Sequence, residues 1–180
     1  AALFANAATF LQLAALAWVV DASLLPALAP ALISGLVAVA LFAAFLWRRA
    51  PDEGLKLSDA PQSAFCFTHA LAFAALMTVV TSWVGWMKGN FGEWQVMSSV
   101  ALAGLADAHA AAIAAFHLHL AAPPLPESSV VMLMLIGLST NTFSKLAAAW
   151  TTGGRDYALS LLPGLAAMLG AAWVGAVVFG

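Results

Sequence analysis

The chain has few charged residues, a single cysteine and no excess of basic side chains. Only 8% of its 180 residues are charged, against about a quarter in an ordinary soluble domain. Because 64% of the residues are hydrophobic, a soluble fold of this size could not bury so much apolar surface. The net charge of -2 excludes the basic stripe that nucleic-acid binding requires. Cys66, the one cysteine, allows no intrachain disulfide and no metal–thiolate motif.

The sequence also lacks the motifs of soluble enzymes. It contains no nucleophile–base–orienter set, no phosphate-binding loop and no zinc signature, so we expect no enzymatic activity and no resident cofactor. It begins at Ala1, without a basic segment before the first apolar run, which is not the pattern of a signal peptide. We interpret residues 1–180 as one polytopic membrane domain that forms the C-terminal part of a longer chain.

Long apolar runs are what the sequence has instead. A helix needs about 20 mostly apolar residues to cross a bilayer, and six stretches meet this requirement. We expect helices over residues 1–20, 28–47, 64–87, 95–120, 129–150 and 157–179. Tryptophans near the ends of these stretches are typical of an interfacial belt: Trp18, Trp47, Trp86, Trp94 and Trp150. The predicted fold is an all-α integral membrane protein with six transmembrane helices and the lipid bilayer as its environment.

Basic residues predict the orientation of these helices. Arg48, Arg49 and Lys56 form the largest basic cluster, between the second and third stretches. Since cytoplasmic loops are enriched in lysine and arginine, this loop is expected on the cytoplasmic side. With six crossings, both ends of the segment would also be cytoplasmic.

Two parts of the sequence resemble each other. Residues 9–18 read Thr-Phe-Leu-Gln-Leu-Ala-Ala-Leu-Ala-Trp, and residues 142–150 read Thr-Phe-Ser-Lys-Leu-Ala-Ala-Ala-Trp. Each has an asparagine shortly before it and a Leu-Leu-Pro sequence after it. Shared Ala/Leu composition is the alternative explanation, but the ordered landmarks favour a repeat of helices 1–2 in helices 5–6. Four crossings separate the two units, so we expect a parallel repeat, with a site at the repeat interface near the middle of the membrane.

The fourth expected helix contains an aspartate and a histidine near its middle. Ionisable residues within membrane spans are rare and usually have a partner or a role. Asp107 has small neighbours three and four residues away, so we expect it to face another helix. His109 lies about 200° further around a regular helix. Both side chains can reach one site only if the helix is distorted, for example by a π-bulge near Gly104.

The fifth expected helix carries a polar band at the same depth. Asn141 and Lys145 are four residues apart and therefore share a face, and Thr142 lies beside them. An ion pair between Asp107 and Lys145 is the simplest way to satisfy both charges. Two hypotheses follow: the pair fastens two helices, or Asp107, His109, Asn141, Thr142 and Lys145 form an ion or proton site.

The remaining histidines allow a third, remote hypothesis. Antiparallel packing would bring His69 and His117 to a similar depth on one side of the membrane. Such a pair could ligate a b-type haem or a metal. Interfacial histidines that reach lipid headgroups are commoner, and we expect this of His119.

Two motifs resemble those of a known family. Residues 104–110, Gly-Leu-Ala-Asp-Ala-His-Ala, resemble the Gly-Leu-Ala-Asp-x-Asp-Ala signature of a bacterial membrane domain of unknown function. Residues 138–145 resemble its Ser-Asn-Thr-x-x-Lys stretch, with Thr140 as an extra residue, and residues 153–155 resemble the loop that follows. The resemblance covers essentially all 180 residues. It implies a polytopic inner-membrane protein whose domain follows an MgtC/SapB-like membrane domain in the same chain, a pair described as a transporter.

One departure from the family signature affects the expected ion. His109 stands where the family has its second aspartate, and Mg²⁺ would favour two carboxylates. A softer divalent metal ion or proton-coupled chemistry through His109 is then easier to accommodate. We expect a small-ion transporter or channel-like subunit in which Lys145 pairs with Asp107 in one state and releases it in another. The alternative is a regulatory or assembly module that binds a partner membrane protein, and the sequence leaves a homo-oligomer open.

Overall fold

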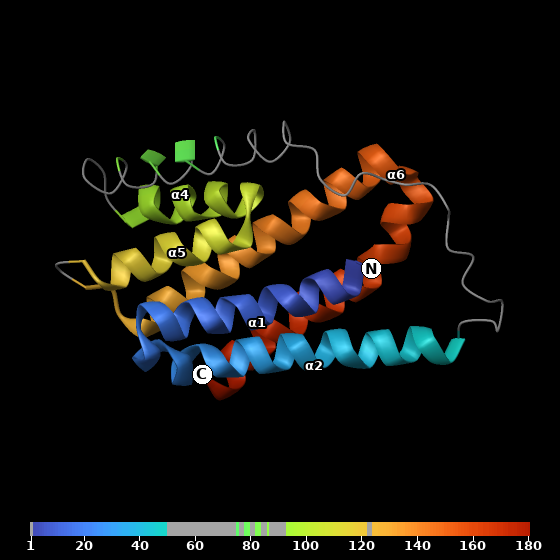
Figure 1. Cartoon of the computed structure of the whole chain (residues 1–180), viewed down its shortest axis with the longest axis horizontal. Helices are drawn as coiled ribbons and strands as arrows, with labels where there is room; N and C mark the ends of the chain where they lie inside the picture. The colour runs from blue at the N-terminus through green and yellow to red at the C-terminus, as the bar shows by residue number, and fades with distance from the viewer. Residues whose placement is uncertain are drawn as a thin grey trace.

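The chain folds into a bundle of helices. The computed structural model describes residues 2–49, 75, 78–79, 82–83, 86, 93–121 and 124–180. The elements in these ranges are α1 (Ala2–Val20), the short 3-10 helix η1 (Ala22–Leu24), α2 (Leu25–Arg49), α4 (Glu93–Ala106), α5 (Ala108–His119) and α6 (Glu127–Phe179) (Figure 1). The all-α prediction is confirmed for this part of the chain, which contains no strand. Most of the expected helix 64–87 lies outside the described residues.

Three helical segments are long and apolar enough to cross a membrane. They are Ala22–Arg48, Glu127–Thr151 and Gly154–Phe179, and two shorter apolar helices cover Ala5–Val20 and Val96–Ala106. Large apolar side chains on these segments remain exposed, as lipid contact requires; the tryptophans among them are Trp18, Trp47 and Trp150. The chain is therefore built for association with a membrane, although the count of six spans is not confirmed.

The expected helix 95–120 is interrupted at its centre. Asp107 has an extended backbone, with φ -162° and ψ 141°, so α4 ends before it and α5 begins after it. Val100, Gly104 and Ala111 all lie against Gly137 of α6. In one straight helix Val100 and Ala111 would be about 16 Å apart along the axis. The two short helices therefore fold back on each other as a hairpin with Asp107 at its tip, which Figure 1 shows beside α6.

Helix α6 is two helices joined at a sharp bend. Gly154 has φ 81°, a conformation that favours glycine because it has no Cβ. The indole Nε1 of Trp173 donates a 3.1 Å hydrogen bond to the Ser139 hydroxyl, so the second half packs back along the first. Gly175 in the second half approaches Ser34 and the Pro30 carbonyl of α2. This close contact ties the C-terminal part of α6 to α2.

The parallel repeat is not confirmed by the directions of the helices. Helix α1 runs opposite to α2, and the second half of α6 runs opposite to both α2 and the first half of α6 (Figure 1). Residues 9–18 and 142–150 therefore run in opposite directions. The reason is the hairpin at Asp107, which turns the chain around where the sequence predicted a crossing. For the same reason, the two ends of the segment lie at opposite ends of the bundle rather than on one side.

Small residues hold the hairpin against α6. A Cβ added to Gly104 would overlap Thr140 and the Gly137 carbonyl, and one added to Gly137 would overlap Ala111. Such contacts let helix backbones approach closely. They place the tip of the hairpin beside the middle of the first half of α6, at the depth where the polar residues of that helix lie.

Candidate functional site

The break at Asp107 gives its carboxylate two functions. It caps α5, because a carboxylate oxygen accepts a 3.1 Å hydrogen bond from the backbone N–H of His109. The same carboxylate lies beside the imidazole, with Nδ1 of His109 3.1 Å from both Oδ1 and Oδ2. The sequence required a distorted helix to bring these two side chains into one site. The distortion is a complete break rather than a π-bulge.

His109 connects the hairpin to α1. Its Nε2 lies 2.9 Å from Oε1 of Gln12, 97 residues earlier in the chain. The imidazole thus bridges the Asp107 carboxylate and the Gln12 amide through its two ring nitrogens. The side chains of His109 and Asp107 keep 30% and 23% of their surface exposed. The pair is therefore accessible from outside the protein core.

Lys145 does not pair directly with Asp107. Its ammonium Nζ donates a 2.9 Å hydrogen bond to Oδ1 of Asn6 on α1, while the ion pair of Asp107 is with His109. The predicted direct Asp107–Lys145 pair is thus absent from this part of the structure. The physical reason is the capping geometry, which turns the carboxylate toward the start of α5. The two charges still lie close enough to interact electrostatically.

Asn141 and Thr142 are buried in the first half of α6, the helix that packs against the hairpin. Thr142 donates a 2.8 Å hydrogen bond to the Leu138 carbonyl, so its hydroxyl hydrogen is used within its own helix. Asn141 is only 5% exposed, and its amide makes no hydrogen bond to the described residues. No fully sealed polar atom lacks a partner in this part of the chain, so the Asn141 amide keeps a small accessible area. It lies one helical turn before Lys145.

These residues form one group at the middle of the bundle, which we call the midspan polar cluster. Its members are Asn6, Gln12, Asp107, His109, Asn141, Thr142 and Lys145. Three elements contribute to it: α1, the tip of the α4–α5 hairpin, and the first half of α6. Asp107, His109 and Lys145 are linked to each other or to α1 by contacts and charge interactions, whereas Asn141 and Thr142 belong to the cluster by their position within about one turn of Lys145.

The sequence of the chain matches the model of one protein family. The family model described as Domain of unknown function (DUF4010) matches residues 1–153. The chain belongs to this family. The DUF4010 match contains α1, α2, the hairpin and the first half of α6, and therefore every residue of the midspan polar cluster. The comparisons with curated proteins and with solved structures found no match.

Two members of the cluster were not among the predicted site residues of this DUF4010 chain. Gln12 and Asn6 are neutral, and neutral polar residues in an apolar helix more often bond to their own backbone. The internal resemblance contained the signal, since it aligns Gln12 with Lys145 and places an asparagine before each segment. Thr9 and Thr142, which the resemblance also aligns, make the same bond to the carbonyl four residues earlier.

The other histidines lie away from the cluster. His119 has Nδ1 2.7 Å from the Leu125 carbonyl and Nε2 3.7 Å from Oδ2 of Asp21, at the end of the bundle. His117 is exposed. His69 lies outside the described residues, so the bis-histidine haem hypothesis stays a prediction. In the ranges that the structure describes, no group of three His, Cys, Asp or Glu side chains could hold a metal ion.

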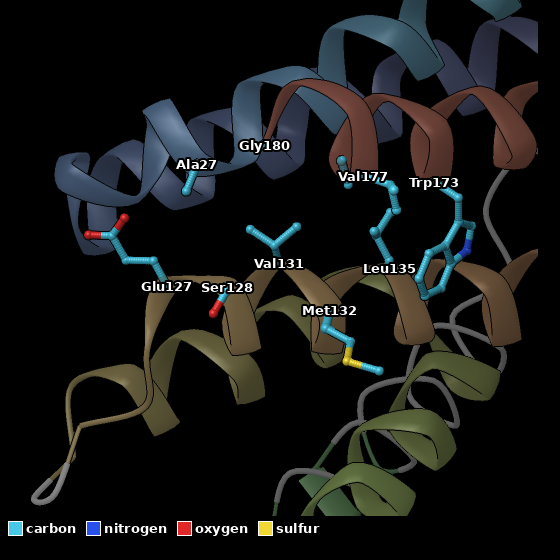
Figure 2. A pocket seen from close by; sticks show the side chains of 10 residues that line it. Ala27, Glu127, Ser128, Val131, Met132, Leu135, Trp173, Val177 and Gly180 are labelled. Carbon is cyan, nitrogen blue, oxygen red and sulfur yellow. The ribbon is translucent and has the colours of Figure 1, made fainter.

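A cavity of about 420 Å³ lies apart from the cluster. Figure 2 shows it between the start of α2 and the two halves of α6. Its lining is mainly apolar and consists of Ala27, Glu127, Ser128, Val131, Met132, Leu135, Trp173, Ala176, Val177 and Gly180. Because no residue of the midspan polar cluster lines it, we assign it no part in the chemistry of the cluster.

Proposed function

We propose that this chain is a multi-pass transporter or channel-like subunit for a small ion in the bacterial inner membrane. The midspan polar cluster is its ion site. The observation that carries the proposal is the break at Asp107, which puts a carboxylate and an imidazole at the tip of a helical hairpin halfway along the bundle. An MgtC-like membrane domain in the same full-length chain and a homo-oligomer are further parts of the proposal.

The hairpin favours transport over the alternative of a regulatory or assembly module. Non-helical backbone at membrane depth is tolerated where it is buried in protein or lines a water-filled cavity. Transporters bring such broken helices together at their binding sites. An assembly module could use the small residues of an unbroken helix to pack against a partner, and it would not need an accessible Asp107 at the break.

The charges at the two ends of the bundle give the orientation. Arg48 and Arg49 end α2, and Arg155 follows the bend of α6 at the same end of the bundle (Figure 1). Asp21 and Glu127 lie at the other end. By the positive-inside rule the arginine end is cytoplasmic, so the hairpin enters the membrane from the opposite, periplasmic side.

The mechanism we propose couples ion movement to a change of partners. In the arrangement described here Asp107 pairs with His109, and Lys145 is bound by Asn6. In the second state Lys145 pairs with Asp107 after the hairpin tip shifts relative to α6. His109 is then released from Asp107 and can exchange a proton with the accessible side through its imidazole.

Ion flux in proteoliposomes containing the full-length chain tests the proposal. We would compare the wild type with Asp107→Asn and Lys145→Met, using indicators for H⁺ and for Mg²⁺, Mn²⁺, Zn²⁺ and Co²⁺. Both variants should lose at least about 99% of the flux, because a positioned proton-transfer group contributes about 10²–10⁴-fold. Asn keeps the ability to cap α5, so the first variant removes charge with little change in the fold.

Asp21→Asn is the matched control. Asp21 caps η1 through the backbone N–H of Ser23 at 2.9 Å, which is the same type of contact as that of Asp107, but it lies at the end of the bundle. Its flux should equal that of the wild type. Normal transport by folded Asp107→Asn would contradict the mechanism. Absence of any flux from the wild type would favour the assembly module.

A further inference from the structure

The hydrogen-bond donors of the midspan polar cluster point to the class of ion that it takes. We infer that the cluster binds a small monovalent anion, such as a halide or a carboxylate, through the Lys145 ammonium and the Asn141 amide, rather than a divalent cation. This inference deepens the proposed function and rests on it for the location of the site. It assigns new roles to Lys145 and Asn141 as the ligands of the transported species.

Asp107 offers little to a cation in this arrangement. Its carboxylate accepts the backbone N–H of His109 and contacts the imidazole Nδ1 with both oxygens. Divalent cations such as Mg²⁺ and Ca²⁺ need several oxygen ligands that are free to coordinate. The neighbouring ammonium of Lys145 would also repel a cation. Within the described residues no set of three acidic, histidine or cysteine side chains supplies an alternative site.

Lys145, in contrast, has hydrogen-bond donors that no described residue uses. An ammonium carries three N–H donors, and the described residues engage one of them, through the neutral Oδ1 of Asn6. Lys145 is part of a segment long and apolar enough to cross the membrane, where a charged side chain is costly unless it has partners. The carboxylate of Asp107 makes no direct ion pair with Lys145, because it is held by the backbone N–H and the imidazole of His109. A bound anion would accept hydrogen bonds from the two remaining N–H donors of Lys145.

Asn141 provides the second observation. Its side chain is 95% buried, since only 5% of its surface is exposed, and no described residue bonds to its amide. The amide keeps a small accessible area, through which an acceptor from outside the chain can reach its N–H groups. Asn141 and Lys145 lie one turn apart on the same helix face. An amide N–H and an ammonium at this spacing can donate to one anion from the same side.

The test measures anion binding and ion flux in parallel on the full-length chain. Thermal unfolding in detergent is followed in sodium chloride, sodium nitrate and sodium formate, with sodium gluconate at equal ionic strength as the bulky reference. We expect the three small anions to raise Tm by roughly 2–4 °C above gluconate, because ligands that bind the native state stabilise it. Lys145→Met and Asn141→Leu should each abolish this difference, whereas Arg155→Gln, which removes a cation outside the cluster, should keep it.

Each result distinguishes the inference from the proposed function. An anion-specific rise in Tm that Lys145→Met removes, without ion flux, would keep the anion site and overturn the transporter. Flux that does not depend on the anion, together with equal Tm in chloride and gluconate, would keep a transporter and overturn the anion site. If Lys145→Met does not fold, Asn141→Leu decides: an unchanged anion-specific rise in that variant would overturn the inference.

Discussion

Asp107 combines a structural and an electrostatic role in one side chain. Aspartate competes for backbone N–H groups and therefore favours helix starts over helix interiors. Here this preference ends α4 and begins α5. The resulting turn sets the directions of α5 and α6. The same carboxylate fixes the His109 ring at 3.1 Å. A change at Asp107 therefore separates into a loss of capping and a loss of charge.

Two substitutions at Asp107 separate these contributions. Asp107→Ala should reduce the free energy of unfolding by about 0.5–2 kcal/mol relative to Asp107→Asn, since asparagine can cap a helix and alanine cannot. Both remove the charge, so neither should support ion flux. Reversible unfolding in detergent, followed by circular dichroism, measures the difference. Equal stabilities would show that the cap at the hairpin tip contributes nothing to the fold.

Asp21 permits a prediction about pH outside the membrane spans. The hydroxyl and the backbone N–H of Ser23 hydrogen-bond to this carboxylate and hold the pKa of Asp21 below its ordinary value. The ionised form is therefore favoured in the folded state. The associated stabilisation is present above the unfolded-state pKa and is lost as the pH falls through the lower, folded-state pKa.

Replacing Ser23 should reverse that shift in part. In Ser23→Ala the hydroxyl is lost and the backbone N–H remains, so the pKa of Asp21 should rise toward its ordinary value without reaching it. Carbon-detected NMR of the Asp21 carboxyl group during an acid titration measures this change. The Ser160→Ala variant is the control, because Ser160 bonds only to the Tyr157 carbonyl. An unchanged pKa in Ser23→Ala would contradict the assigned cause.

The residues of the site were easier to predict than their partners. Asp107, His109 and Lys145 stand out because ionisable groups within apolar stretches are rare. The pairing of Asp107 with His109, and of Lys145 with Asn6, depends on which way the side chains point after the helix breaks. A single aspartate among alanines and leucines does not reveal that break, since the apolar run continues on both sides of it.

At the scale of helices, close contacts between small residues determine where the hairpin sits. Gly104 and Gly137 each meet backbone or side-chain atoms of the opposing helix, with no room for a Cβ. Gly104→Ala and Gly137→Ala should therefore lower the free energy of unfolding by about 1–3 kcal/mol, as overpacked contacts do. They should also move the hairpin tip and weaken ion flux. Denaturant unfolding and the flux assay measure both effects.

Gly170 provides the matched control for these two glycines. Like Gly137, it lies within α6, but a Cβ added there meets nothing within 4 Å. Because alanine has a higher helix propensity than glycine by up to about 1 kcal/mol, Gly170→Ala should be neutral or stabilising. If Gly104→Ala and Gly137→Ala behave like Gly170→Ala, the hairpin is not held by close packing.

The long apolar helices were predictable from the sequence. Of the two points where the chain reverses direction, Gly154 was predictable and Asp107 was not. Hydropathy places α2 and both halves of α6 near their observed bounds, and Gly153-Gly154 marked the second bend as a loop. The reversal at Asp107 has no glycine or proline at its turn. A window long enough to detect a span averages over one polar residue, so it reports a single crossing where the chain turns back.

At the scale of the whole molecule, the hairpin changes which ends of the helices lie together. Two short helices in place of one crossing reverse the first half of α6 relative to α1, so the two similar segments are antiparallel. Inverted repeats with a site at their interface are common in secondary transporters. This arrangement also brings Arg155 to the same end of the bundle as Arg49, which makes the basic residues segregate more clearly than six crossings would.

Cysteine labelling distinguishes this topology from six crossings. Single cysteines at Ala22, Leu120 and Arg155, introduced after Cys66→Ser, are treated with a membrane-impermeant maleimide in sealed, oriented vesicles. The structure predicts that Ala22→Cys and Leu120→Cys are labelled from one side and Arg155→Cys from the other, because His119 and Asp21 meet at one end of the bundle and Gly154 turns the chain at the other. Six crossings predict the reverse grouping, with Ala22 and Arg155 together and Leu120 apart. That result would remove the re-entrant hairpin and the antiparallel relation of the two segments, and with them the structural basis for a site at the tip.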